Sequence, residues 1–94
     1  MEINETIWLD EVVIKIARKH KLTTIEVDEV FYNKPKFKKV QKGKSKGEDL
    51  YFAYGRTDSG RYLVVIFIYK KSKDALIITA RDMDLNERQS YAKK

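Results

Sequence analysis

A small set of polar residues lies at the predicted ends of strands and helices, where side chains can reach a substrate. The set comprises Glu48, Asp49, Arg56, Arg61, Arg81, Arg88, Tyr91 and His20. Arginine binds phosphate through parallel N–H donors and stays charged, whereas carboxylate, imidazole and phenol groups can transfer protons. RNA can be cleaved by such groups without a metal ion, because its own 2′-hydroxyl is the nucleophile. The chemistry within reach is therefore RNA cleavage by general acid–base catalysis, with cations that stabilise the phosphorane.

The composition argues against most other kinds of catalytic centre. The chain has no cysteine, which excludes disulfides, thiol catalysis and thiolate metal sites, and its one histidine is His20. It contains no glycine-rich phosphate loop and no G-x-S-x-G motif. We therefore expect neither a metal ion nor a cofactor.

The net charge of +6 is unevenly distributed along the chain. Residues 1–32 carry seven acids and four bases, whereas residues 33–47 carry seven lysines and no acid. These lysines are Lys34, Lys36, Lys38, Lys39, Lys42, Lys44 and Lys46. Clustered positive charge attracts polyanions by releasing their counterions, so we expect these lysines and Arg61 to bind RNA. The alternative is a solvated lysine loop that only keeps the protein soluble.

The first third of the chain predicts two helices. Apolar residues recur at three- and four-residue spacing between residues 7 and 19, which gives one apolar stripe. Thr23 and Glu26 have the spacing of a capping box at the start of a second helix. That helix must end before Pro35, because the residue that precedes a proline is disfavoured in the helical conformation.

The rest of the chain predicts a sheet followed by a short helix. Strands are expected at residues 36–41, 50–57, 61–70 and 75–80, with tight turns at residues 58–60 and 72–74. Asp84 and Glu87 have capping-box spacing for a helix through Tyr91. Two N-terminal helices, a three- to four-stranded antiparallel sheet and a C-terminal helix make an α+β fold, which we expect to be one domain over residues 1–94.

Nothing in the sequence indicates export or membrane insertion. The longest apolar run, residues 62–69, has eight residues, whereas a membrane helix needs about 20. The first eight residues have neither the basic start nor the apolar segment of a secretory signal. We expect a cytoplasmic protein with no membrane partner.

Three stretches of the chain resemble the BrnT family of toxins from bacterial toxin–antitoxin pairs. They are RKHKLTTIEVDEVFYNKP at residues 18–35, YGRTDSGRYLVVIF at residues 54–67 and IITARDMDLNERQSY at residues 77–91. The positions that match the family pattern are Lys19-His20, Gly55-Arg56-Thr57, Gly60-Arg61, Thr79-Ala80-Arg81, Glu87-Arg88 and Tyr91. Each motif alone is unspecific, but all of them occur here in the order that the family shows.

The resemblance implies a RelE-like ribonuclease fold and a metal-independent ribonuclease that arrests translation. It also implies an antitoxin, usually with a ribbon-helix-helix segment that binds DNA, so the toxin reaches DNA only through its antitoxin. The chain departs from the family pattern at Leu76, where an arginine is common. It departs again at Val12 and Ile16, where a lysine and an asparagine are common.

The residues that we expect at the catalytic centre are Arg56, Arg81, Glu48, His20, Arg88 and Tyr91. Five of these six residues have a structural alternative. These alternatives are an ion pair with Asp84 or Glu87 for Arg81, turn packing for Arg56, a helix cap for His20, solvation for Glu48, and core packing for Tyr91.

Two other functions stay open at this point. One is a non-catalytic RNA-binding module in which Tyr51, Phe52 and Tyr54 stack on bases. The other is an interaction protein whose apolar sheet face is covered by a partner. Salt-sensitive RNA binding without cleavage distinguishes the first of these from a ribonuclease.

Overall fold

The computed structural model describes residues 1–44 and 47–93. Its elements in chain order are β1 (Thr6–Ile7), α1 (Asp10–His20), α2 (Thr24–Tyr32), β2 (Lys36–Gln41), β3 (Asp49–Arg56), β4 (Tyr62–Tyr69), β5 (Ala75–Asp82) and α3 (Leu85–Ala92). The strands form one sheet in the order β1-β5-β4-β3-β2, in which β1 is parallel to β5 and the other neighbours are antiparallel. The predicted α+β class and the predicted order of helices and main strands are confirmed.

Capping boxes mark where two of the helices begin. Thr23 and Glu26 form the box at the start of α2, and Asp84 and Glu87 form the box at the start of α3, both as predicted. In each box the first side chain accepts the backbone N–H of the glutamate, at 3.1 Å in α2 and 2.8 Å in α3. Within the described part of the chain, no helix is long and apolar enough to cross a membrane.

The sheet has one strand more than the sequence predicted. β1 consists of Thr6–Ile7 and pairs in parallel with Ala75 and Leu76. Two residues are too few to show an alternation of polar and apolar side chains, so the pattern did not separate them from the helix that follows. For this reason α1 begins at Asp10 and not at Ile7.

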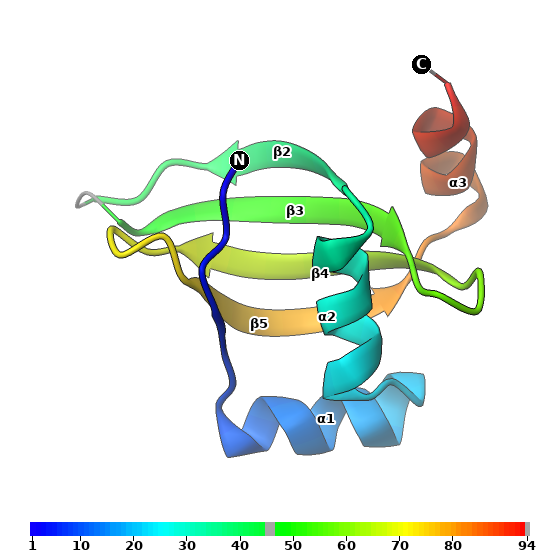
Figure 1. Ribbon diagram of the computed structural model, residues 1–94, viewed down its shortest axis with the longest axis horizontal. Helices are drawn as coiled ribbons and strands as arrows, with labels where there is room; N and C mark the ends of the chain where they lie inside the picture. Colours follow the sequence, from blue (N-terminus) through cyan, green and yellow to red (C-terminus); the bar gives the residue numbers. More distant parts are fainter. Residues whose placement is uncertain (45–46, 94) are drawn as a thin grey trace.

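The helices α1 and α2 pack on one face of the sheet, and Figure 1 shows α3 standing apart from both near the C-terminus. The core between helices and sheet contains Val12, Ile16, Leu22, Val27, Val30, Ala53, Leu63, Val65, Phe67, Ala75, Ile77 and Ala80. Gly55 allows α2 to approach the sheet, since a Cβ there would lie 2.9 Å from Cγ1 of Val30. Any larger residue at this position would push α2 away from β3.

The second face of the sheet, which α1 and α2 leave uncovered, is the open face. Side chains alternate along a strand, so the neighbours of the core residues Ala53 and Ala80 project from this face. Tyr54, Val64 and Arg81 are aligned in register and form one row across β3, β4 and β5. In this row the open face carries an aromatic residue on β3, a buried valine on β4 and an arginine on β5.

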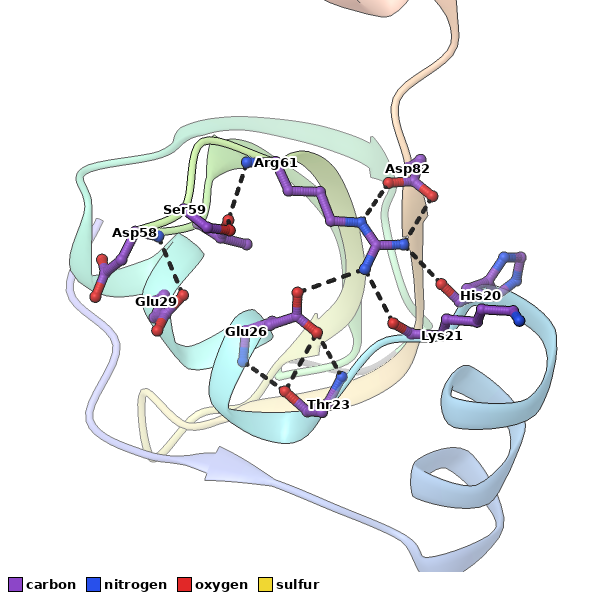
Figure 2. Close-up of polar contacts among 10 residues, drawn as sticks. His20, Lys21, Thr23, Glu26, Glu29, Asp58, Ser59, Arg61 and Asp82 are labelled. Carbon is purple, nitrogen blue, oxygen red and sulfur yellow. Dashed lines mark hydrogen bonds and ion pairs between the residues drawn. The ribbon is translucent and has the colours of Figure 1, made fainter.

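On the helix face, Arg61 joins four elements (Figure 2). Its guanidinium group donates to both carboxylate oxygens of Asp82, at 2.7 and 3.0 Å, and to Glu26 at 3.4 Å. It also donates to the backbone carbonyls of His20 and Lys21, at 2.7 and 2.9 Å. A guanidinium group has five N–H donors, and these five hydrogen bonds use all of them. Arg61 thus connects the start of β4 and the end of β5 to the C-terminus of α1 and the first turn of α2.

Replacing Arg61 by alanine should lower the free energy of unfolding by about 2–3 kcal/mol, because charged hydrogen bonds are lost and two helix-end carbonyls lose their donor. Urea denaturation followed by circular dichroism measures this loss. Arg18→Ala is the matched control, since Arg18 lies exposed in the last turn of α1 and contributes less than about 1 kcal/mol through the helix dipole. Equal losses in the two variants would contradict the structural role of Arg61.

Candidate functional site

Three of the predicted catalytic residues gather around one tyrosine at the end of the open face. Arg56, the last residue of β3, lies directly opposite Tyr62, the first residue of β4. The guanidinium carbon of Arg56 lies 4.8 Å from the centre of the Tyr62 ring, and that of Arg88 lies 4.3 Å from it. Tyr91 meets the same ring edge-on, with 6.0 Å between ring centres. We call Arg56, Tyr62, Arg81, Arg88 and Tyr91 the arginine–tyrosine cluster.

Arg81 enters this cluster through an ion pair with α3. Its two terminal nitrogens donate to the two carboxylate oxygens of Glu87, at 2.6 and 2.8 Å. The hydrogen bond from Arg81 lowers the pKa of Glu87 below its usual range, so Glu87 is a carboxylate at neutral pH. The pair attaches α3 to the end of β5 and fixes the direction of the Arg81 side chain.

Lys36 holds the other end of α3. Its ammonium group donates to the backbone carbonyls of Tyr91 and Lys93, at 2.6 and 2.8 Å, and lies 5.1 Å from the centre of the Tyr91 ring. A cation at a helix C-terminus satisfies carbonyls that have no partner within the helix. Lys36 therefore stabilises the helix that carries Arg88 and Tyr91.

Arg56 and Arg88 are the cations that can accept an anionic ligand. In residues 1–44 and 47–93 neither guanidinium group has an ion pair or a side-chain hydrogen bond, and both residues are exposed. Both groups lie against the ring of Tyr62, which places them in one region of the surface. A guanidinium on an aromatic face keeps its N–H donors at the edge, available for phosphate oxygens.

A family model for the ribonuclease toxin BrnT of type II toxin–antitoxin systems matches residues 8–87. The chain belongs to the BrnT family. Membership implies an RNA substrate and a cognate antitoxin. A comparison with curated protein sequences gives no significant match.

In this BrnT-family chain, two of the predicted catalytic residues lie away from the cluster. His20 ends α1 on the helix face, where its carbonyl accepts a hydrogen bond from Arg61. Glu48 precedes β3, at the opposite end of that strand from Arg56, which places it roughly 25 Å away at about 3.3 Å per residue. Among the residues that the structure describes, neither of these two contacts the cluster, and all the donors of Arg61 are engaged on the helix face.

The predicted RNA-binding lysines that the structure describes lie before, along and after the edge strand β2 and do not converge on one point. Lys34, Lys38, Lys42 and Lys44 are exposed. Lys39 pairs with Asp49 at 3.2 Å. Lys46 lies outside the described residues. Their contribution to RNA binding stays a prediction, and among them Lys36 has a clear structural role.

The three residues that depart from the family pattern lie outside the arginine–tyrosine cluster. Val12 and Ile16 are buried in the core beneath α1, so they are not part of the cluster. Leu76 is aligned with Ile68, four residues along β4 from the row that contains Arg81. This separation is roughly 13 Å. The position where the family commonly has an arginine therefore lies in a row distant from the cluster.

Tyr62 and Glu87 are the residues of this site that the sequence did not assign to it. The signal for Tyr62 was the turn at residues 58–60, because a hairpin centred there places residues 56 and 62 opposite each other. Glu87 was predicted as a helix cap and as one alternative partner of Arg81, and the structure shows both contacts at once. In residues 1–44 and 47–93, no three histidine, aspartate or glutamate side chains form a group that could hold a metal ion.

The Arg81–Glu87 pair makes stability depend on pH. Because folding lowers the pKa of Glu87 from its ordinary value of 4.5, the pair contributes fully above that pH and loses its contribution as the pH falls through the lower folded value. We expect Glu87→Gln to be less stable than the wild type at neutral pH, with the difference shrinking between about pH 5 and pH 3. Urea unfolding of both proteins across this pH range measures the difference in their free energies of unfolding.

Glu48→Gln is the control for this experiment, since Glu48 is an exposed loop residue. It should follow the wild-type curve at every pH. A deficit of Glu87→Gln that is the same at neutral and at acidic pH would contradict a stabilising carboxylate at this position.

Proposed function

We propose that this BrnT-family chain is a metal-independent endoribonuclease that cleaves RNA through the 2′-hydroxyl and arrests translation. The observation that carries the proposal is the placement of Arg56 and Arg88 on the ring of Tyr62, without an acidic partner among the described residues. Two such guanidinium groups form a cradle for one phosphate diester. Arg81 adds a third cation whose charge is partly balanced by Glu87.

In the proposed reaction the 2′-oxygen forms a bond to phosphorus while the bond from phosphorus to the 5′-oxygen breaks. The products are a 2′,3′-cyclic phosphate and a free 5′-hydroxyl. Negative charge develops on the non-bridging oxygens, where Arg56 and Arg88 stabilise it electrostatically. We assign to Tyr91, whose ring contacts Tyr62, the donation of a proton from its hydroxyl to the leaving 5′-oxygen. The 2′-hydroxyl gives its proton to solvent water, from which Tyr91 regains one after the products leave, because Glu87 is a weak base while its ion pair lowers its pKa.

We further propose that the protein acts in the cytoplasm and is neutralised by an antitoxin of the ribbon-helix-helix type. Membership of a family of type II toxins supports a cognate antitoxin as the partner. In this arrangement the antitoxin supplies the DNA-binding segment, and the toxin contacts DNA only through it.

Expression of the wild-type chain in bacteria should arrest growth and fragment RNA. The Arg56→Ala, Arg88→Ala double variant should slow cleavage by at least about 100-fold, since one lost transition-state contact costs on the order of 10²–10³ in rate. The Arg56→Ala, Arg81→Ala double variant should behave alike. Growth curves, and cleavage of a labelled RNA by purified protein, measure these effects.

The matched control is Lys42→Ala with Lys44→Ala, which removes the same charge from the loop after β2. It should change cleavage by less than about tenfold, because exposed lysines act on encounter and not on the transition state. Toxicity that survives in the Arg56, Arg88 variant would refute this site. Salt-sensitive RNA binding by the wild type, with intact RNA, would support the non-catalytic RNA-binding module instead.

Cleavage should continue in the presence of EDTA and should leave 2′,3′-cyclic phosphate ends. An RNA with a 2′-deoxy nucleotide at the cleaved position should stay intact there, since it lacks the nucleophile. End-group analysis of the fragments by mass spectrometry distinguishes these products. Activity that disappears with EDTA and returns with Mg²⁺ would contradict the metal-independent reaction.

A further inference from the structure

A groove of about 540 Å³ separates α3 from the strands β2 and β3. Its lining residues are Lys36, Phe37, Lys38, Tyr54, Asp84, Asn86, Glu87, Ser90 and Tyr91. None of the proposed catalytic roles uses Asn86, Ser90 or Lys38. Its size falls within the range of about 300–1,000 Å³ that is typical of small-ligand sites.

The groove and the arginine–tyrosine cluster share two residues of α3, Glu87 and Tyr91. These residues are four positions apart, so their side chains lie on the same side of the helix. Both line the groove, and Glu87 also binds Arg81 while Tyr91 also contacts the ring of Tyr62. A nucleotide that contacts both the cluster and the groove has its phosphate at the arginines and its base in the groove.

The lining of the groove combines aromatic surface with hydrogen-bonding groups. Tyr54 and Tyr91 supply two rings. Burial, together with the charge of Glu87, raises the pKa of Tyr54, so its hydroxyl stays protonated and can donate a hydrogen bond. Asn86 offers an amide with both donors and an acceptor, and Ser90, one turn later, offers a hydroxyl. A flat heterocycle with polar edges fits such a lining, because its face stacks and its edge forms hydrogen bonds.

We propose that this groove binds one unstacked nucleobase of single-stranded RNA, next to the phosphate that is cleaved, and that Asn86 and Ser90 read its edge. This proposal rests on the proposed ribonuclease function, because the arginines locate the phosphate. In this proposal α3 determines which base is preferred, and the arginine–tyrosine cluster carries out the cleavage. Lys38, exposed at the rim on β2, adds a contact to the backbone of the same nucleotide.

The test compares wild type with Asn86→Ala, Ser90→Ala and with the control Gln89→Ala, which lies exposed on α3 outside the groove. All three proteins cleave a random-sequence RNA pool, and sequencing of the ends gives the preference at each position. The wild type and the control should share a preference at one nucleotide beside the cleaved bond. The double variant should lose that preference by about tenfold, as expected for loss of a base-edge contact, whereas Gln89→Ala should keep both the preference and the total cleavage of the wild type.

A second measurement separates this proposal from the proposed function. Short 2′-deoxy oligonucleotides, which are not cleaved at their phosphates, are titrated by fluorescence anisotropy with each base in turn at the position of interest. Base-dependent affinity that the double variant loses supports the groove, even if no protein cleaves RNA and the ribonuclease proposal fails. An unchanged preference in the double variant, or affinity that never depends on the base, would overturn the proposal. Melting curves of the variants confirm that each one is folded.

Discussion

The contact of Arg61 with Asp82 determines how the rest of the structure is arranged. Both side chains lie on the helix face, where Arg61 also binds the carbonyls at the end of α1. Side chains alternate between the faces of a sheet, so the residues next to this pair, Tyr62 and Arg81, must project from the open face. One ion pair on the structural side thus orients two members of the arginine–tyrosine cluster on the other side. The pair also lowers the pKa of Asp82, which keeps the carboxylate charged and the contact intact at neutral pH.

Three arginines in one place repel one another, and the structure limits this cost in two ways. Glu87 balances Arg81 through two short hydrogen bonds. The ring of Tyr62 offers its negative face to Arg56 and Arg88, which orients them without neutralising their charge. In the proposed reaction, positive potential is therefore preserved at the phosphate, and little reorganisation is needed when charge develops on it. The helix α3 contributes no buried residue, so polar and aromatic contacts hold it on the sheet. The position of this helix, and of the groove beside it, consequently depends on the same charges that form the site.

Much of the fold followed from local rules. The capping boxes at Thr23 and Asp84 predicted the starts of α2 and α3, because their hydrogen bonds involve residues only three positions apart. The turn at residues 58–60 predicted the hairpin of β3 and β4. Residue type and motif order also predict site residues at Arg56, Arg81, Arg88 and Tyr91. What failed locally was β1, whose two residues are a strand only because β5 lies beside them.

Composition, periodicity and short-range spacing were enough to predict the class of fold and the inventory of charged residues, and the resemblance of three stretches indicated the family. Which of those residues share a site became visible in the folded chain alone. His20 and Arg61 match the family motifs as well as Arg81 does, yet they lie on the helix face, and Arg61 has no donor left for a substrate. The reason is the face on which each residue projects. That face depends on strand register and helix packing, which join positions that are distant in the sequence.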